Sequence, residues 1–282
     1  MKELNGRVVM ITGGAGGVGM GMARAFGGRG AKLVLCDIDP SRTKDCVDEL
    51  RGRGFEAHGR ALDVADHRAW GETVEEVERT VGPIGVLCNN AGLGAHGPVA
   101  EFDIDVWRRV IEINLFGVFY GCRTVLSRML ARREEAHIVN TASLSGMFPR
   151  GGSPYITSKF GVVGFSGDLR EELKGSNVGV SVLCPAMVRT NFVSNSARVL
   201  GADSPGDSAM SGVLAQGVDP DKVGDLVVRS ILQGDFYIMT HGEWEPILRK
   251  HFDEILQSFG EGADPNYVGD LAALSAALGR EV

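Results

Sequence analysis

This sequence of 282 residues lacks an excess of positive charge, since its formal net charge is −7. An acidic balance disfavours general binding to nucleic acid or to anionic membranes, because their phosphates repel it. No charge-free apolar run reaches the roughly 20 residues of a membrane-spanning helix, and the chain begins with no signal-peptide core. We therefore expect a cytoplasmic protein that binds neither nucleic acid nor membrane.

Cysteine and histidine are also scarce. None of the five cysteines forms a Cys-x-x-Cys pair, and Cys36, Cys88 and Cys184 lie in apolar runs. Such cysteines are expected to be buried free thiols in a reducing compartment. The histidines show no metal-ligand spacing and are assigned to the core or the surface, at positions 58, 67, 96, 137, 241 and 251. The sequence predicts no metal site.

What the chain does have is an alternation of short apolar runs and longer amphipathic stretches. The runs predict strands over 8–11, 32–36, 56–62, 84–88, 137–141, 179–183 and 236–240. The stretches predict helices over 18–29, 41–53, 66–81, 103–132 and 154–174. Apolar strands separated by helices indicate a parallel sheet covered on both faces. With right-handed crossovers this gives an α/β fold, a single-domain, Rossmann-type doubly wound sheet.

A glycine-rich segment lies between the first strand and the first helix. Gly14, Gly16 and Gly19 match G-x-G-x-x-G, and Gly13, Gly17 and Gly19 match G-x-x-x-G-x-G. In either register, bare backbone lets a pyrophosphate approach a helix N-terminus, where free N–H groups and the helix dipole favour anions. The segment predicts a dinucleotide site that includes Gly13, Gly16, Gly17, Val18 and Gly19.

The choice of dinucleotide depends on the end of the second strand. Asp37 stands there, followed by Ile38. A carboxylate at this place accepts hydrogen bonds from the adenosine ribose and repels a 2′-phosphate, which favours NAD over NADP. The nearest following basic residue is Arg42. The alternative is therefore an NADP-dependent reductase in which Arg42 meets the 2′-phosphate.

A candidate acid/base pair follows the fifth strand. Tyr155 and Lys159 are four residues apart in a predicted helix and so share one face. A neighbouring ammonium favours the phenolate, which makes Tyr155 a candidate general acid/base. Ser143 ends the apolar run 137–143 and can hold a carbonyl or alcohol oxygen beside the tyrosine. Tyr-x-x-x-Lys alone is common on helix surfaces and gains weight only from the dinucleotide pattern.

With these motifs in order, residues 5–240 resemble the single-domain branch of the short-chain dehydrogenase/reductase family. The resemblance implies a catalytic set of Ser143, Tyr155, Lys159 and Asn114. Lys159 would lower the Tyr155 pKa and bind the nicotinamide ribose, and Asn114 would hold a water. The further cofactor contacts that it implies come from Asp63, Val64, Asn90, Ala91, Gly92, Pro185, Val188 and Thr190. Ala186 stands where the family usually has glycine, and its methyl group is expected to narrow the nicotinamide side of the cofactor site slightly.

The substrate is indicated only in class. The expected pocket wall is mainly apolar, although each member can instead pack in the core: Leu93, Leu144, Met147, Phe148, Met187 and Phe192. Residues 223–256 resemble a sub-branch that includes the Cα-dehydrogenases of lignin-derived β-aryl ether alcohols. The resemblance implies NAD-dependent interconversion of a bulky apolar or aromatic secondary alcohol and its ketone. A non-catalytic NAD-binding regulator is the other class, but it would not need the whole catalytic set.

The chain is divided accordingly into residues 1–242, the NAD-binding catalytic domain, and 243–282, a helical extension. The extension packs on the same domain or on a partner subunit. Within the first part, residues 194–220 are rich in Gly, Ser, Asp and Pro and are interpreted as a surface lid. Its stretch 203–212 is expected to order when substrate binds. The resemblance also implies a homodimer or homotetramer, with the helices of 103–132 and 154–174 packed across a two-fold axis.

Overall fold

The computed structural model describes residues 1–149, 151, 153–201, 207–260 and 269–278. The chain divides into two compact units, Met1–His241 and Gly242–Val282. The second unit is helical in its described residues, with a short turn at Gly242–Trp244 (η4), α10 (Glu245–Gln257), η5 (Ser258–Gly260) and α11 (Leu271–Leu278). Pro246 lies in the first turn of α10, where its missing N–H costs no hydrogen bond. How the extension packs stays a prediction.

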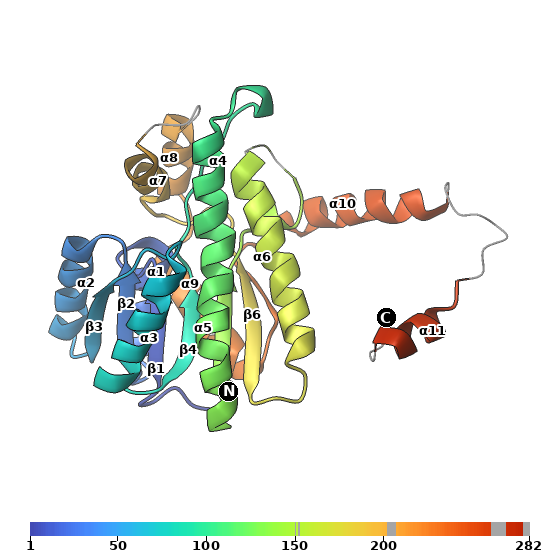
Figure 1. Cartoon of the computed structure of the whole chain (residues 1–282). Coiled ribbons are helices and arrows are strands. Elements are labelled where there is room, and N and C mark those ends of the chain that lie inside the picture. The colour runs from blue at the N-terminus through green and yellow to red at the C-terminus, as the bar shows by residue number, and fades with distance from the viewer. Residues whose placement is uncertain (150, 152, 202–206, 261–268, 279–282) are drawn as a thin grey trace. The chain divides into compact units, whose positions relative to one another are not determined.

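The first unit is built on a seven-stranded sheet in the order β3-β2-β1-β4-β5-β6-β7, with every pair parallel. Figure 1 shows helices on either side of this sheet. The strands are β1 (Val8–Thr12), β2 (Lys32–Asp37), β3 (Ala57–Ala61), β4 (Ile84–Asn89), β5 (Ala136–Thr141), β6 (Val178–Cys184) and β7 (Tyr237–Met239). This confirms the predicted doubly wound fold. The chain order reverses between β1 and β4, and ligands of such sheets bind at the strand carboxyl ends beside that switch point.

The helices form one layer on each face. The described α-helices of the first unit are α1 (Gly17–Gly27), α2 (Pro40–Gly52), α3 (His67–Thr80), α4 (Ile104–Ile111), α5 (Gly117–Arg132), α6 (Ser153–Glu172), α7 (Phe192–Leu200), α8 (Asp207–Ala215) and α9 (Pro220–Gln233). One core cluster joins α1, α2 and α9 to the sheet, and a second joins α3, α4, α5 and α6 to it. Helices α1 and α9 touch through Gly21 and Gly224, where a Cβ on Gly21 would lie 2.0 Å from the Pro220 carbonyl oxygen.

The longest helical stretch of the described residues runs from Ile104 to Arg132 and contains α4, a π-helical turn η2 (Glu112–Phe116) and α5. This stretch is long and apolar enough to cross a bilayer, but a helix in the core of a protein can meet the same criteria of length and composition. Val110, Val118 and Val125 on this helix are buried in the sheet-facing core. Such π turns are frequent at functional sites, and this one carries Asn114.

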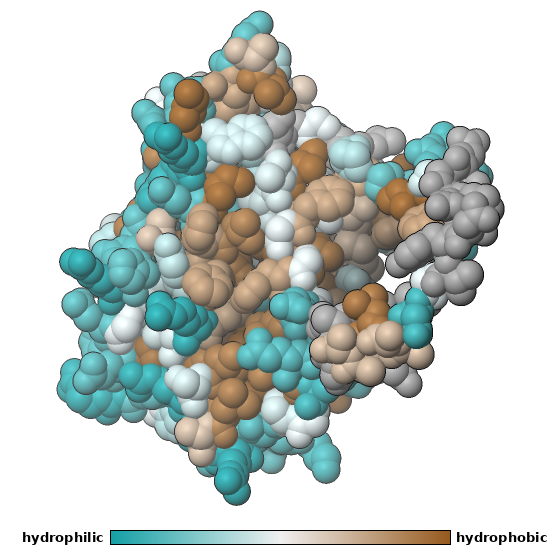
Figure 2. Space-filling view, turned by 45° about the vertical axis from the view of Figure 1, so that its right-hand side comes forward, coloured by the Kyte–Doolittle hydropathy of each residue, from teal (hydrophilic) through white to brown (hydrophobic). Residues whose placement is uncertain are grey.

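Aromatic side chains are exposed on the outer face of η2, α5 and α6. Phe116, Phe119 and Phe160 are each about two-fifths exposed, at 45%, 41% and 39%. Phe119 also contacts Tyr120 and Phe165, with ring centroids 5.9 and 6.0 Å away. Figure 2 shows apolar side chains gathered over this face. A face of this kind suits contact with another surface.

The segment 194–220, interpreted from its composition as a surface lid, contains helices that the sequence did not indicate, and its role as a lid stays a prediction. Most of its described residues lie in α7, α8 and the start of α9. Ser196 of α7 is buried, and a β-bridge joins Val188 to Val218. Tertiary contacts therefore stabilise short helices that composition alone does not favour. Part of the expected ordering segment 203–212, namely 203–206, lies outside the described residues.

The five cysteines are all free thiols. Burial raises the pKa of Cys36, Cys122 and Cys184 to about 12 and raises that of Cys88 further. Cys46 on α2 is only half-buried. Four of the thiols are therefore held protonated inside the first unit.

Candidate active site

The glycine loop between β1 and α1 has the geometry of an anion cradle. Gly13 and Gly17 have φ angles of 61° and 52°, which favour glycine. A Cβ on Gly13 would lie 2.9 Å from the Ala91 Cα, and one on Gly19 would lie 2.3 Å from the Gly13 carbonyl oxygen. The N-cap residue Gly16 brings no capping side chain, so the first amides of α1 stay available to an anion. The loop fits a pyrophosphate.

Asp37 closes the loop on the β2 side. Its carboxylate accepts hydrogen bonds from the backbone N–H groups of Ala15 and Asp39, both at 3.2 Å. Ile38, the next residue, is exposed. The carboxylate is thus fixed at the carboxyl end of β2, beside the loop, as the adenosine site requires.

Arg42 reaches the same loop from α2. Its guanidinium donates to the Ala15 carbonyl at 3.1 Å and to Asn195 Oδ1 on α7 at 2.8 Å. A Cβ on Gly16 would lie 2.9 Å from one of its nitrogens. Arg42 therefore lies close to the predicted cofactor path, with two of its donors used inside the protein.

The segment after β4 is tied to the glycine loop through Thr12. The Thr12 hydroxyl accepts from the N–H groups of Asn90 at 2.9 Å and Ala91 at 3.1 Å. The Asn90 amide donates to the carbonyls of Thr12 at 3.1 Å and Gly13 at 3.3 Å. The loop after β4 and the glycine loop are thus held together across the switch point.

Asp63 and Val64, two of the predicted cofactor contacts, follow β3. Asp63 accepts from Ala65 N–H at 3.0 Å and pairs with Arg109 at 2.7 Å. The Val64 side chain is buried and its carbonyl accepts from the Trp70 indole at 3.0 Å. These bonds fix the backbone at the carboxyl end of β3, one strand beyond Asp37.

The four predicted catalytic residues converge at the same edge of the sheet. Lys159 is almost fully buried and donates to the Thr141 carbonyl at 2.9 Å. Its Nζ lies 5.7 Å from the centre of the Tyr155 ring. Ser143 stands at the start of the turn η3 (Leu144–Gly146), and its hydroxyl acts to lower the pKa of the neighbouring Tyr155 phenol. Serine, tyrosine and lysine thus form one cluster.

Asn114 joins this cluster through the backbone. Its amide accepts from Leu93 N–H at 2.7 Å and donates to the Leu93 carbonyl at 2.8 Å and to Ser158 Oγ at 3.0 Å. A Cβ on Gly92 would lie 3.3 Å from both Asn114 Oδ1 and Lys159 Nζ. The absence of a side chain at Gly92 therefore lets Asn114 of the π turn and Lys159 of α6 come close to the loop after β4.

Burial shifts the pKa of both Tyr155 and Lys159, while the lowering of the Tyr155 pKa by Lys159 stays a prediction. Burial raises the pKa of Tyr155 above its usual value, and the Ser143 hydrogen bond acts in the opposite direction. Burial also lowers the pKa of Lys159 to about 8. Desolvation disfavours the charged form of each group, and it is the largest influence on both pKa values.

Residues 185–190 line the other side. The Pro185 carbonyl accepts from Leu144 N–H at 2.9 Å and from Ser143 Oγ at 3.3 Å. Val188 is buried, and Thr190 packs on Gly17, with its Cγ2 3.0 Å from a Cβ built there. This segment therefore connects Ser143 to the glycine loop.

The expected pocket wall falls into two groups. Leu93, Leu144 and Phe148 are buried, whereas Met147, Met187 and Phe192 are half-buried. Among the half-buried three, Phe192 packs on Tyr155, with ring centroids 5.8 Å apart and an interplanar angle of 62°.

Two histidines near the site were missed in the sequence. The half-buried His96 ring lies 5.9 Å from the Tyr155 ring. His241 Nε2 donates to the Met187 carbonyl at 3.0 Å. The only signal for His96 was its place four residues beyond Gly92; His241 gave none, because it is distant in sequence from Met187.

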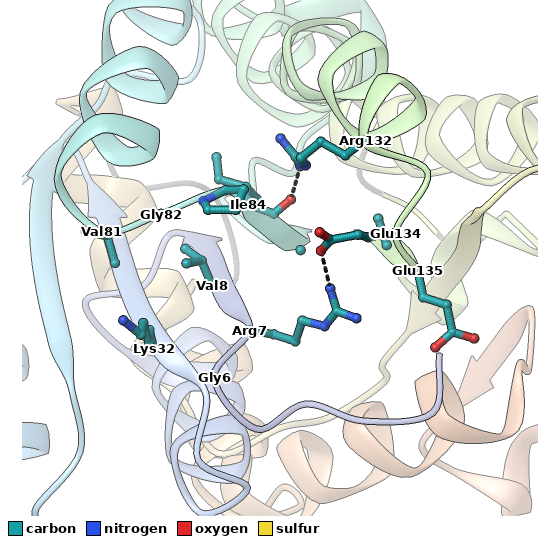
Figure 3. A pocket seen from close by; sticks show the side chains of 13 residues that line it. Gly6, Arg7, Val8, Lys32, Val81, Gly82, Ile84, Arg132, Glu134 and Glu135 are labelled. Carbon is teal, nitrogen blue, oxygen red and sulfur yellow. Dashed lines mark hydrogen bonds and ion pairs between the residues drawn. The ribbon is translucent and has the colours of Figure 1, made fainter.

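A separate hollow of about 170 Å³ lies at the opposite, amino end of the strands. Figure 3 shows Arg7 and Glu134 pointing toward each other at its opening, with Arg132 bonded to the Ile84 carbonyl. None of the predicted catalytic or cofactor residues lines it. The position of this hollow argues against a part in catalysis, because ligands of such sheets bind beside the switch point at the carboxyl ends of the strands.

Comparison with known proteins agrees with the site. Residues 7–199 match the family model of short chain dehydrogenases. The chain belongs to the short-chain dehydrogenase family. It is therefore an oxidoreductase of the alcohol–ketone class that uses a nicotinamide dinucleotide.

Several relatives extend this match over most of the chain. A C alpha-dehydrogenase of Sphingobium sp. strain SYK-6 is 31% identical over 92% of this chain and 88% of its own. A short chain dehydrogenase/reductase structure from Burkholderia phymatum in complex with NAD is 32% identical, with a TM-score of 0.86 and coverage of 96% and 100%. An actinorhodin polyketide ketoreductase with NADPH is 30% identical, with a TM-score of 0.75 and coverage of 86% and 98%. The short-chain dehydrogenases similar to this chain thus include both NAD and NADPH complexes.

Proposed function

We propose that this short-chain dehydrogenase uses NAD to interconvert a bulky apolar or aromatic secondary alcohol and its ketone. The observation that carries the proposal is the convergence of Ser143, Tyr155, Lys159 and Asn114 beside a glycine loop closed by Asp37. A regulator that only binds the dinucleotide would not need this cluster. The printed activity of the Sphingobium relative, a C alpha-dehydrogenase, supports the alcohol class.

The cofactor side depends on charge. The first amides of α1 bind the pyrophosphate, and Asp37 binds the adenosine ribose hydroxyls. Asp37 also repels a 2′-phosphate, and Arg42 is already bonded to Ala15 and Asn195. NAD is therefore the favoured cofactor, and the closeness of Arg42 to the loop keeps NADP as the alternative that the experiment must test.

The reaction side depends on proton transfer. The bound nicotinamide supplies the acceptor or donor of the hydride. In oxidation, Tyr155 takes the alcohol proton and Ser143 orients the alcohol oxygen. In reduction, Tyr155 returns the proton to the carbonyl oxygen. Lys159 stabilises the phenolate and binds the nicotinamide ribose, while Asn114 fixes the Leu93 backbone beside it.

The test is NADH formation at alkaline pH over secondary alcohols, aryl and aliphatic, with NAD and NADP in parallel. We expect turnover with NAD, and a loss of about 10²- to 10⁴-fold in Tyr155→Phe because its acid/base group is gone. The affinity for NADH, measured by fluorescence, should stay within about twofold, since the other cofactor contacts remain.

Tyr237→Phe is the matched control, because Tyr237 is a half-exposed residue of β7 outside the site. Substantial turnover in Tyr155→Phe would remove the acid/base assignment. Equal turnover with NADP would remove the cofactor assignment. Absence of turnover with every alcohol would contradict the proposed reaction.

A further inference from the structure

Two aromatic rings pack against the ring of Tyr155, and the three residues come from three separate segments of the chain. Tyr155 lies on α6, Phe192 begins α7, and His96 lies in the loop after β4. The Phe192 and His96 rings lie 5.8 and 5.9 Å from the Tyr155 ring, at interplanar angles of 62° and 55°. Both distances fall within the range of attractive aromatic pairs. The acid/base group therefore has aromatic neighbours from two different segments.

Phe192 is fixed in this position by the backbone of the β4 loop. A Cβ on Gly94 would lie only 2.7 Å from a Phe192 ring carbon, so the ring packs directly on the bare backbone. The Ser196 hydroxyl accepts from Gly94 N–H at 2.9 Å and donates to the Phe192 carbonyl at 2.8 Å. The first turn of α7 is thus bound to the loop that carries His96.

The loop itself is held by a catalytic residue. Asn114 makes two hydrogen bonds to the Leu93 backbone, and the Leu93 and Ala95 side chains are buried. His96 follows directly and is half-buried. The position of His96 therefore depends on the same anchor that positions the catalytic cluster.

We infer that His96 and Phe192 are specificity-determining residues, which select secondary alcohols carrying a planar aromatic ring on the carbinol carbon. The inference rests on the proposed function. A substrate oxygen bonded to the Tyr155 phenol brings the substituents of its carbinol carbon beside the rings that flank that phenol. A flat aromatic ring can pair edge-to-face or offset with them, whereas a saturated ring of equal size has no π system to pair and makes apolar contacts alone.

The experiment compares 1-phenylethanol with 1-cyclohexylethanol, which share the carbinol and differ in ring flatness. We measure kcat/KM with NAD for the wild type, His96→Leu, His96→Phe and Phe192→Leu. The wild type should prefer the phenyl alcohol, and the two leucine variants should lower that preference by about three- to tenfold, the range of an aromatic pair. His96→Phe keeps a ring and should keep the preference. His67→Leu, at an exposed histidine of α3, is the control.

Binding of acetophenone and cyclohexyl methyl ketone to the NADH complex, followed by NADH fluorescence, gives a readout independent of turnover. The same variants should lower the ratio of the two ketone affinities. Melting temperatures show whether Phe192→Leu folds; His96→Leu, in a loop, tests the inference if it does not.

The outcomes are distinguishable. Turnover of both alcohols with a ratio near one, or a ratio unchanged in His96→Leu and Phe192→Leu, overturns the inference and leaves the proposed function standing. An equal loss for both alcohols would indicate a structural role only and also overturns it. Failure of the wild type to oxidise either alcohol, or any other in the panel, with NADH binding intact, would overturn the proposed function itself.

Discussion

At the scale of the single residue, burial governs the proton chemistry of the site. Tyr155 and Lys159 stand four residues apart, and this spacing correctly predicts that they share a helix face. It says nothing of how much water they lose. In the structure, desolvation raises the tyrosine pKa and lowers the lysine pKa to about 8. At neutral pH the phenol therefore keeps its proton, ready to donate it.

A pH dependence follows from the raised Tyr155 pKa. Oxidation needs the phenolate, which forms only as pH rises toward that pKa. The rate of alcohol oxidation should therefore increase from pH 7 to 10, by up to about tenfold per unit. Reduction needs the phenol and should change little between pH 6 and 9. Initial rates in both directions, at saturating cofactor, measure this.

Tyr155→Phe supplies the baseline, because its residual rate should show no such slope. An oxidation rate that is flat from pH 7 to 10 would mean that the phenol does not limit the reaction. If the reduction rate already decreases as the pH rises from 6 to 9, the pKa of the Tyr155 phenol in the working site is lower than its burial implies.

At the scale of the element, α7 is attached to the cofactor side of the first unit. Asn195 accepts from Arg42, which is also bonded to the glycine loop at Ala15. Arg198 pairs with Asp39, the N-cap of α2, at 3.3 Å. The helix that presents Phe192 to the tyrosine is thus connected to the segment expected to bind adenosine.

Asn195→Ala should loosen α7. It removes a hydrogen bond to a charged group, worth about 1.5–3 kcal/mol, so amide hydrogen exchange across 192–200 should speed up by about tenfold or more. Exchange in α3 should not change. Ser194→Ala is the matched control, since the hydroxyl of the exposed Ser194 bonds within its own turn, to the Asn191 carbonyl. Equal exchange in both variants would show that the bond does not hold the helix.

The elements differ in how well the sequence predicts them. The strands and the long helices follow apolar runs and amphipathic periods, which are local properties. Helix α7 was missed because its stability comes from partners such as Gly94 and Arg42, far away in the chain. The positions of the glycine loop, of Asp37 and of the cluster of Ser143, Tyr155, Lys159 and Asn114 could be predicted from motifs. His96 could not, because only the fold brings its loop to Tyr155.

At the scale of the whole molecule, the exposed aromatic face of η2, α5 and α6 calls for a partner (Figure 2). We propose that a second copy of the chain covers it, in a homodimer or homotetramer. Three large aromatic side chains on one face, Phe116, Phe119 and Phe160, are each roughly two-fifths exposed. Burying such side chains against another subunit removes apolar area from water and stabilises the assembly.

Phe119→Asp should therefore shift the protein to a smaller species, because a carboxylate in the centre of an apolar interface is costly. Light scattering coupled to size-exclusion chromatography measures the mass. Val99→Asp is the control, since Val99 is 71% exposed on a different element, the short turn η1 (Val99–Glu101). An unchanged mass in Phe119→Asp, with the fold intact, would place the contact elsewhere.

The distribution of the thiols has a practical consequence. Four cysteines are buried and remain protonated at any working pH, so alkylating reagents reach them slowly. Cys46 is half-buried on α2, within the electrostatic reach of Asp37 and Arg42. A maleimide fluorophore added at mildly alkaline pH should attach there first. The unmodified sequence thus offers one labelling handle beside the adenosine end of the site, where emission could follow dinucleotide binding without an introduced cysteine.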